Sequence, residues 1–429
     1  MKKLIEYIDP RIIYTEAPKT GLNDREKNVL RELASKVQHY AQDAKQDKKR
    51  ELWYAHNSLQ RVRPMVLVFP EGAWLEILPW DDMVCRDEFY RAYEWMMRRL
   101  CYRYEHFNDD FVIEPVIEVP LVYEITPFMK GGASFIHMDM KDTGEGIHQK
   151  KILLEHMEDF QKFFKPEFFL HREASARNLY LIQEVIGDLI EVRHCGYLAP
   201  DTSLLRQFIE MRGTEQIFYD LYDQPEWLHK VLDFMKDAAL ELLDVMEPYL
   251  LDTNTGNDYI GSGGIGYMRG QEADRALYSN SWGFSDAQEL AGVSPDMYEE
   301  FATAYHQPLL ERFGWSCYGC CEPMTDKFDI IKRRIKNLRR VSVNPWTDRE
   351  AAASALSDRY IYSWKPAPTV VTQGFDGEMA ERDIQKTMEI AGSCVVEMIL
   401  KDTVTVQHKP ERIQKWIHAA KNIAEKGYA

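Results

Sequence analysis

Eight short apolar segments, each followed by a helical pattern, place the strongest limit on how this chain folds. They lie near residues 64, 112, 188, 250, 315, 340, 360 and 395. Strands that alternate with helices build parallel sheets, and eight such units in about 370 residues are typical of a barrel. We therefore predict an α/β fold, a (βα)8 TIM barrel, over residues 61–429.

Residues 1–60 precede the first predicted strand and are polar and rich in charge. Within them Leu30, Leu33, Val37 and Tyr40 recur at three- and four-residue steps. This spacing predicts helix over residues 23–60. We expect residues 1–60 to form an N-terminal helical extension of the barrel.

Composition excludes several classes of function. With 53 basic and 69 acidic residues the formal charge is -16, which disfavours binding to nucleic acid. No apolar run approaches the roughly 20 residues of a membrane span, and the first residues lack the apolar core of a secretory signal. We expect a cytoplasmic protein with no membrane partner, and its seven cysteines, an odd number, imply no disulfide framework.

The sequence WSCYGCCEPMTD at residues 315–326 is the most informative motif. It places Cys317, Cys320 and Cys321 within five positions, at the predicted end of a strand. Clustered thiols on such a loop are typical of metal ligands or nucleophiles. Strand alternation predicts that Tyr318 and Cys320 face the barrel interior and that Cys317 faces away, and it allows only one of the two adjacent cysteines to point inward.

In a barrel of this kind the active site lies at the carboxyl ends of the strands. This rule excludes Cys394 from the candidate active-site residues, because it lies at the start of a predicted strand. Aromatic side chains, Trp282 among them, are candidates to line a site for a flat substrate, and Lys365 is a candidate to bind a carboxylate. The residues that the rule selects at strand ends are His194, Cys195, Asn257, Asp258, Tyr259, Tyr318, Cys320, Cys321, Glu322, Trp364 and Lys365.

Two further stretches are predicted loops. The run GSGGIG at residues 261–266 would need a preceding apolar strand and a following helix to bind a dinucleotide, but the continuation YMRGQEADR is not helical. Residues 131–146 show no clear period and form a long predicted loop, a feature that is often functional.

Several segments resemble the uroporphyrinogen decarboxylase superfamily. They are DQPEWLH at residues 223–229, DYIGS at 258–262, SPDMYEEF at 294–301 and the cysteine loop. The superfamily includes the decarboxylase itself and zinc-dependent corrinoid methyltransferases such as methylcobamide:coenzyme M methyltransferase. The resemblance spans roughly residues 60–425 and implies the barrel fold.

The resemblance is greater to the methyltransferase branch. The decarboxylase branch carries arginines after its first strand, whereas residues 69–74 read FPEGAW and offer Glu71 instead. The methyltransferase branch carries a His-x-Cys motif, which aligns Tyr318 with the histidine and Cys320 with the cysteine. Its further cysteine near the last strand has no counterpart at residues 400–402.

The resemblance implies transfer of a methyl group between a small methylated substrate, such as a methoxylated aromatic, and the cobalt of a partner corrinoid protein, with zinc activation. We expect catalytic roles for Tyr318, Glu322 and Asp258. The expected zinc ligands are Cys320 and Cys321, with Glu322, Glu397, His194 or His306 as candidates to complete the set, Glu397 being preferred. The predicted substrate-binding residues are His194, Asn257, Tyr259, Trp282, Trp364 and Lys365.

Two other functions remain open at this stage. A metal-free decarboxylase would use cations, for which Lys365, Arg193 and Arg269 are available. A non-catalytic barrel that binds a corrinoid or another tetrapyrrole would change the ligand's spectrum without turnover. The oligomeric state is left open.

Overall fold

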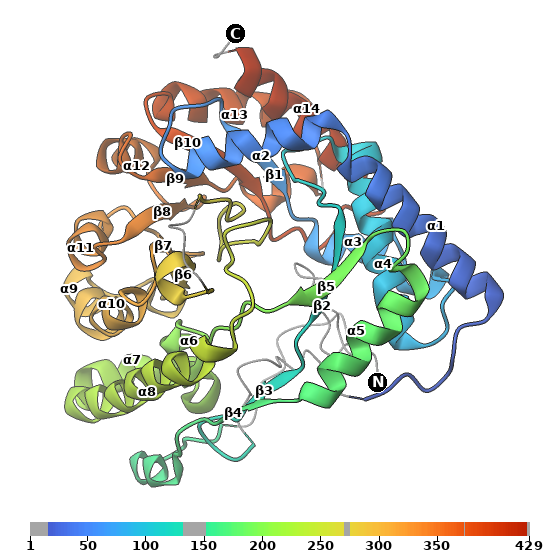
Figure 1. The fold of residues 1–429 in the computed structure, drawn as a ribbon. Coiled ribbons are helices and arrows are strands. Elements are labelled where there is room, and N and C mark those ends of the chain that lie inside the picture. Colours follow the sequence, from blue (N-terminus) through green and yellow to red (C-terminus); the bar gives the residue numbers. More distant parts are fainter. Residues whose placement is uncertain (1–15, 132–151, 270–274, 373, 427–429) are drawn as a thin grey trace.

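A computed structural model describes residues 16–131, 152–269, 275–372 and 374–426. Its centre is made of parallel strands (Figure 1). Six form one sheet in the order β1-β10-β9-β8-β7-β6, and β2 and β5 pair separately. The parallel strands are β1 (Met65–Val68), β2 (Val116–Pro120), β5 (Glu191–Cys195), β6 (Trp282–Ser285), β7 (Trp315–Tyr318), β8 (Leu338–Val343), β9 (Ile361–Trp364) and β10 (Val395–Leu400).

The predicted α/β class with parallel strands is confirmed, but one predicted strand is wrong. Residues 250–254 form no strand, because Asp252 and Asn254 use their side chains to bond the neighbouring backbone at Gly196 and Trp282. Strand β6 takes the place in the sheet that was assigned to that segment. A short antiparallel ribbon, β3 (Tyr123–Ile125) with β4 (Phe168–Leu170), was not predicted.

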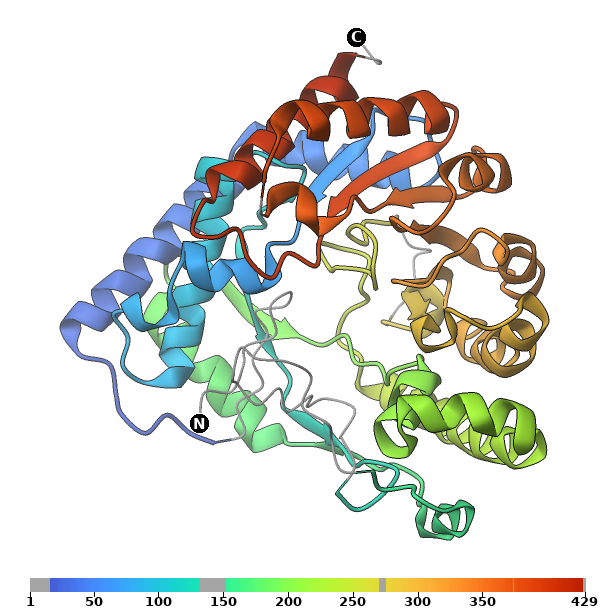
Figure 2. The ribbon, with the colours of Figure 1, turned by 180° about the vertical axis from the view of Figure 1, so that it is seen from behind.

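Helices cover the outer side of the strands, as Figures 1 and 2 show from opposite directions. In the described part of the chain no helix combines the length and the apolar character that a bilayer span requires. The helices that follow the first strand are α3 (Trp74–Ile77), α4 (Glu88–Tyr102), α5 (Arg172–Ile186), α6 (Leu204–Arg212), α7 (Thr214–Asp223), α8 (Pro225–Met246), α9 (Pro295–Tyr298), α10 (Ala304–Leu310), α11 (Phe328–Arg334), α12 (Arg349–Leu356), α13 (Gly377–Ala391) and α14 (Glu411–Lys426).

Two helices precede the first strand where one was predicted. They are α1 (Asp24–Ala41) and α2 (Ala44–Asn57), and the break comes at Asp43, whose side chain caps α2 by accepting from the Lys45 amide at 2.9 Å. Helix α1 packs against α4 and α5, whereas α2 packs against β1. Trp53 and His56 of α2 are buried against the inner side of the sheet.

The glycine-rich segment fills the inner side of the six-stranded sheet. Tyr259 and Ile265 pair across a tight hairpin. A Cβ on Gly263 would lie 2.2 Å from the Arg340 side chain, and one on Gly264 would lie 2.6 Å from a carboxylate oxygen of Glu397. The glycines therefore permit close packing of backbone against side chains.

Candidate functional site

The two adjacent cysteines lie at the carboxyl end of β7, with their sulfurs 3.6 Å apart. Strand β7 ends at Tyr318, and Gly319 follows with a φ of +89°. This left-handed turn ends the strand alternation, so both thiols lie on the same side, Cys320 half-buried and Cys321 exposed. The prediction that only one of them could point to the site is therefore wrong.

The same turn explains why the side chains of β7 point to the opposite side from the one predicted. Cys317 packs in the interior cluster with Trp282, while Tyr318 is fully buried on the helix side. The Tyr318 hydroxyl lies 3.1 Å from the hydroxyl of Tyr298 and 3.1 Å from Nδ1 of His306. Tyr318 thus points away from the cysteine loop's open side, and His306 is likewise engaged in the helix layer.

Glu322 is fully buried beneath the cysteine loop. Its carboxylate accepts from the Cys320 amide at 2.9 Å, the Ala287 amide at 3.0 Å and the Tyr298 hydroxyl at 3.1 Å. These bonds tie the loop after β7 to the segment after β6 and to α9. The structure therefore gives Glu322 the geometry of a group that positions Cys320.

A lysine and a serine stabilise negative charge on Cys320. The hydrogen bond from Cys321, the charge of Lys401 and a hydrogen bond from Ser262 lower the pKa of the Cys320 thiol to about 6. The bond to Cys320 correspondingly raises the pKa of Cys321. Lys401 Nζ lies 3.5 Å from the Ser262 hydroxyl and 3.2 Å from Asp402. At neutral pH the pair therefore carries one thiolate, centred on Cys320.

Two strained residues flank this charge cluster. Glu71, after β1, has a φ of +48°, and Asp402, after β10, has a φ of +58°. Non-glycine residues in this region are uncommon and often occur at functional sites. Burial and the nearby Asp402 raise the pKa of Glu71 to about 7. A carboxyl group that exchanges a proton near neutral pH thus lies close to Cys320.

Two polar atoms near the cluster lack hydrogen-bond partners among the described residues. They are Oε1 of Glu71 and the hydroxyl of Tyr259, both shielded from solvent. The charges that act on Tyr259 are those of Lys401, Glu71, Cys320 and Asp402. Because buried polar groups are normally bonded, these atoms indicate where a ligand's polar atoms would lie.

Asp286, at the carboxyl end of β6, was missed because its strand was missed. It is 2% exposed and bonds the Ser203 hydroxyl. Burial, together with the charges of Glu322 and Cys320, raises its pKa well above the ordinary range. The run GFSD at residues 283–286 was the available signal, but four residues are too few to show a strand period. Lys401 and Ser262 were missed as well.

Among the predicted substrate residues, Tyr259 and Lys365 lie near the cysteines, and Lys365 is 4% exposed at the end of β9. Trp282 is 1% exposed, and its indole donates to the Gly266 carbonyl at 2.8 Å. Trp364 faces the helix layer, 5.4 Å from the Arg349 guanidinium. The two tryptophans therefore pack in cores.

Three other predicted residues lie apart from the cysteines. Asn257 donates to the Val112 carbonyl at 2.6 Å. Asp258 is half-buried and acts electrostatically on Tyr197. His194 on β5 has Nδ1 at 3.1 Å from the Val119 carbonyl of β2. The predicted loop at residues 131–146 lies outside the described residues except for Gly131.

Glu397 takes part in an ionic network inside the sheet. Its carboxylate lies 3.2 Å from His56 Nε2, 3.1 Å from Arg340 Nε and 2.9 Å from the Gly264 amide, which donates to it. Burial alone would raise the pKa of Glu397, but Arg340 and His56 hold it at about 2. With its oxygens already occupied by donors, Glu397 is not arranged as the third ligand beside the cysteines.

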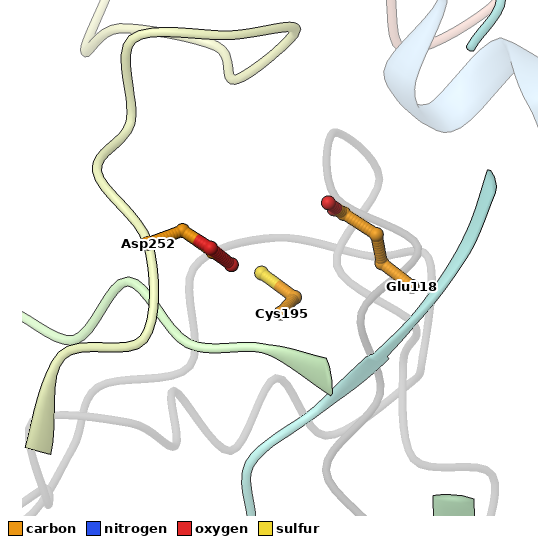
Figure 3. Close-up of side chains that lie close together, drawn as sticks. All are labelled: Glu118, Cys195 and Asp252. Atoms are coloured by element: carbon orange, nitrogen blue, oxygen red, sulfur yellow. The ribbon is translucent and has the colours of Figure 1, made fainter. Parts of the chain in front are cut away.

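Within the described ranges, one group brings three ligand atoms of His, Cys, Asp or Glu within 4.8 Å of one another: Glu118, Cys195 and Asp252. Figure 3 shows the three side chains converging from β2, β5 and the segment after α8. Arg193 lies 3.2 Å from Glu118, and the Gly196 amide donates to Asp252 at 3.0 Å. Both carboxylates already have donors, so this group is explained without a metal.

Comparison with known proteins leaves the family open. No family model matches the sequence. No curated protein matches it either. A solved structure similar to this chain is a methyltransferase from Methanosarcina mazei, with a TM-score of 0.48, 11% sequence identity, and coverage of 89% of this chain and 99% of that chain.

Proposed function

We propose that this chain is an enzyme that transfers a methyl group between a small methylated substrate and the cobalt of a partner corrinoid protein, with zinc held by Cys320 and Cys321. Motif resemblance to the corrinoid methyltransferase branch of the uroporphyrinogen decarboxylase superfamily supports this assignment. We further propose that the two parallel sheets belong to one (βα)8 barrel, whose carboxyl-end face carries the site.

The spacing of the two sulfurs is the observation that carries the proposal. Two thiolates bound to one tetrahedral zinc at about 2.3 Å lie roughly 3.8 Å apart, and the sulfurs of Cys320 and Cys321 are 3.6 Å apart. Metal binding also needs deprotonated thiols: the pKa of Cys320 is lowered to about 6, and zinc would displace the proton that Cys321 still carries. The pair therefore fits two zinc ligands.

Zinc bound here would act as a Lewis acid toward the oxygen or sulfur that carries the methyl group. In the demethylating direction the bond between that heteroatom and the methyl carbon breaks. The corrinoid of the partner protein would supply the electron pair that takes up the methyl group, and the heteroatom would keep the electrons of the broken bond. Glu71, with a pKa of about 7, can supply the proton that the leaving heteroatom takes.

The test is formation of methylcobalamin from methoxylated aromatic compounds with reduced cobalamin as acceptor. Cys320→Ser and Cys321→Ser should each lower the rate at least about 100-fold, because each removes a zinc ligand. Cys394→Ala is the matched control, since Cys394 lies at the start of β10 and its sulfur contacts the Ala353 carbonyl. Full transfer by the double variant Cys320→Ser/Cys321→Ser would refute the proposed role of the pair.

A metal-free decarboxylase is the second candidate, and the buried cations Lys365 and Lys401 favour it. Such an enzyme would stabilise the negative charge that develops as carbon dioxide leaves. Carbon dioxide release by chelator-treated protein, together with no methyl transfer, would select this function.

A further inference from the structure

Two buried lysines lie at the carboxyl ends of neighbouring strands, Lys365 after β9 and Lys401 after β10. They are 4% and 6% exposed, and lysines are rarely so buried unless paired. Lys401 pairs with Asp402 at 3.2 Å. In the part of the chain that the structure describes, Lys365 has no salt bridge, and its Nζ donates only to the Ser363 carbonyl at 3.3 Å and hydroxyl at 3.4 Å.

Both lysines are close to the cysteine pair. The Cys320 carbonyl accepts from Ser342 at 2.9 Å and from Asn344 at 3.2 Å, both on or just after β8, the strand beside β9. The Ser262 hydroxyl lies 3.5 Å from Lys401 Nζ and also bonds the Cys320 sulfur. Lys365 is within electrostatic reach of both Lys401 and Cys320.

A third donor lies in the same region. The Tyr259 hydroxyl is buried without a hydrogen-bond partner among the described residues, and Lys401 is its strongest charged neighbour. Burial lowers the pKa of Lys365 to about 8, so this side chain remains mostly cationic at neutral pH. The region thus offers two ammonium groups and a phenol, and no acidic side chain of the described ranges forms a salt bridge with Lys365.

We propose that Lys365, Lys401 and Tyr259 form a carboxylate subsite beside Cys320, so that the methylated substrate is a carboxylic acid in its anionic form. This assignment of substrate class rests on the proposed methyl transfer. A single carboxylate has enough acceptor sites to take a hydrogen bond from each of these three donors. Glu71 and Asp402, which lie near Lys401, would repel a dianion such as phosphate more strongly.

The experiment compares two alkylating probes at Cys320 in chelator-treated protein. Iodoacetate carries a carboxylate and iodoacetamide a neutral amide; with either, the thiolate displaces iodide and a sulfur–carbon bond forms. The measured ratio is the rate with iodoacetate divided by the rate with iodoacetamide at Cys320, read by mass spectrometry of the peptide. It should be at least about fivefold higher in the folded protein than in the urea-unfolded chain, because the subsite attracts the carboxylate.

Variants connect this ratio to the lysine. Lys365→Gln should lower it at least about threefold, whereas Lys365→Arg keeps the charge and should preserve it. Lys386→Gln, which changes an exposed lysine of α13, is the matched control. A folded-protein ratio equal to that of the unfolded chain, or a ratio unchanged in a folded Lys365→Gln variant, would overturn the subsite. The wild-type comparison stands even if Lys365→Gln fails to fold.

The alkylation ratio needs neither zinc nor corrinoid, so its outcome is separate from that of the proposed function. A high, Lys365-dependent ratio in a protein that transfers no methyl group would support the subsite and refute the methyl transfer. Methyl transfer from a neutral substrate by a protein without a raised ratio would do the reverse.

Discussion

At the scale of single residues, the chemistry depends on where the proton of the cysteine pair resides. Cys320 receives the hydrogen bond from Cys321, lies near Lys401 and bonds Ser262. Each of these contacts favours the thiolate form of Cys320, whereas the side chain of Cys321 is exposed to solvent. Of the two sulfurs, Cys320 is therefore the one that carries the negative charge.

We predict that alkylation of Cys320 by iodoacetamide in metal-free protein has its midpoint near pH 6, because a lowered pKa populates the thiolate at lower pH. Lys401→Met should raise that midpoint by about one unit or more, since it removes a nearby positive charge. Alkylation rates measured by mass spectrometry at a series of pH values give the midpoints of the wild type and of Lys401→Met. A wild-type midpoint at pH 8 to 9 would contradict this assignment.

The members of the candidate site could be predicted from the sequence better than the side of the strand on which each side chain lies. The clustered thiols marked the loop, and Tyr259 and Lys365 lie near it. Tyr318 was assigned to the wrong face because alternation was extended through Gly319, whose positive φ redirects the chain. Glu397 was assigned to the metal, but its partners Arg340 and His56 come from distant segments that no local pattern connects to it.

At the scale of elements, the hairpin of residues 259–265 determines what the inner side of the sheet contains. It brings Tyr259 and Ser262 to the cysteine loop and packs Gly263 and Gly264 on the network of Arg340 and Glu397. The glycine run was recognised as a loop, but its role in packing depends on contacts between segments far apart in the sequence. The order of strands around β6 likewise required the three-dimensional structure.

We predict that Gly264→Ala lowers the free energy of unfolding by about 2–4 kcal/mol, because the added methyl group overlaps buried atoms. It would lie 2.6 Å from the Glu397 carboxylate and 2.7 Å from the Trp53 ring. The control is Gly256→Ala, whose methyl group meets nothing within 4 Å. Urea unfolding of the two variants and the wild type gives the comparison, and equal stability of all three would contradict the packing.

At the scale of the whole molecule, a buried neutral histidine couples stability to pH. His306 on α10 is fully buried, and burial lowers its pKa to about 3. In the unfolded chain the same group takes a proton near pH 6.5. Its contribution to stability is therefore present above pH 6.5 and is lost as the pH falls toward 3, by about 1.4 kcal/mol per pH unit.

Replacing this histidine should flatten the pH dependence of folding. Between pH 6 and pH 4 the free energy of unfolding should decrease less steeply with falling pH in His306→Gln than in the wild type. The difference in slope should be roughly 1 kcal/mol per pH unit. His39→Gln, at an exposed position of α1, should leave the slope unchanged. Urea unfolding at several pH values measures the slopes, and identical slopes for wild type and His306→Gln would disprove the linkage.

The most direct test of the central claim is the zinc content of protein purified without chelator. Mass spectrometry should find about one zinc per chain in the wild type and in Cys394→Ala, and less than about a tenth of that in Cys320→Ser/Cys321→Ser. Such a result would establish the cysteine pair as the metal site. A metal-free wild type, or zinc that the double variant retains in full, would contradict it.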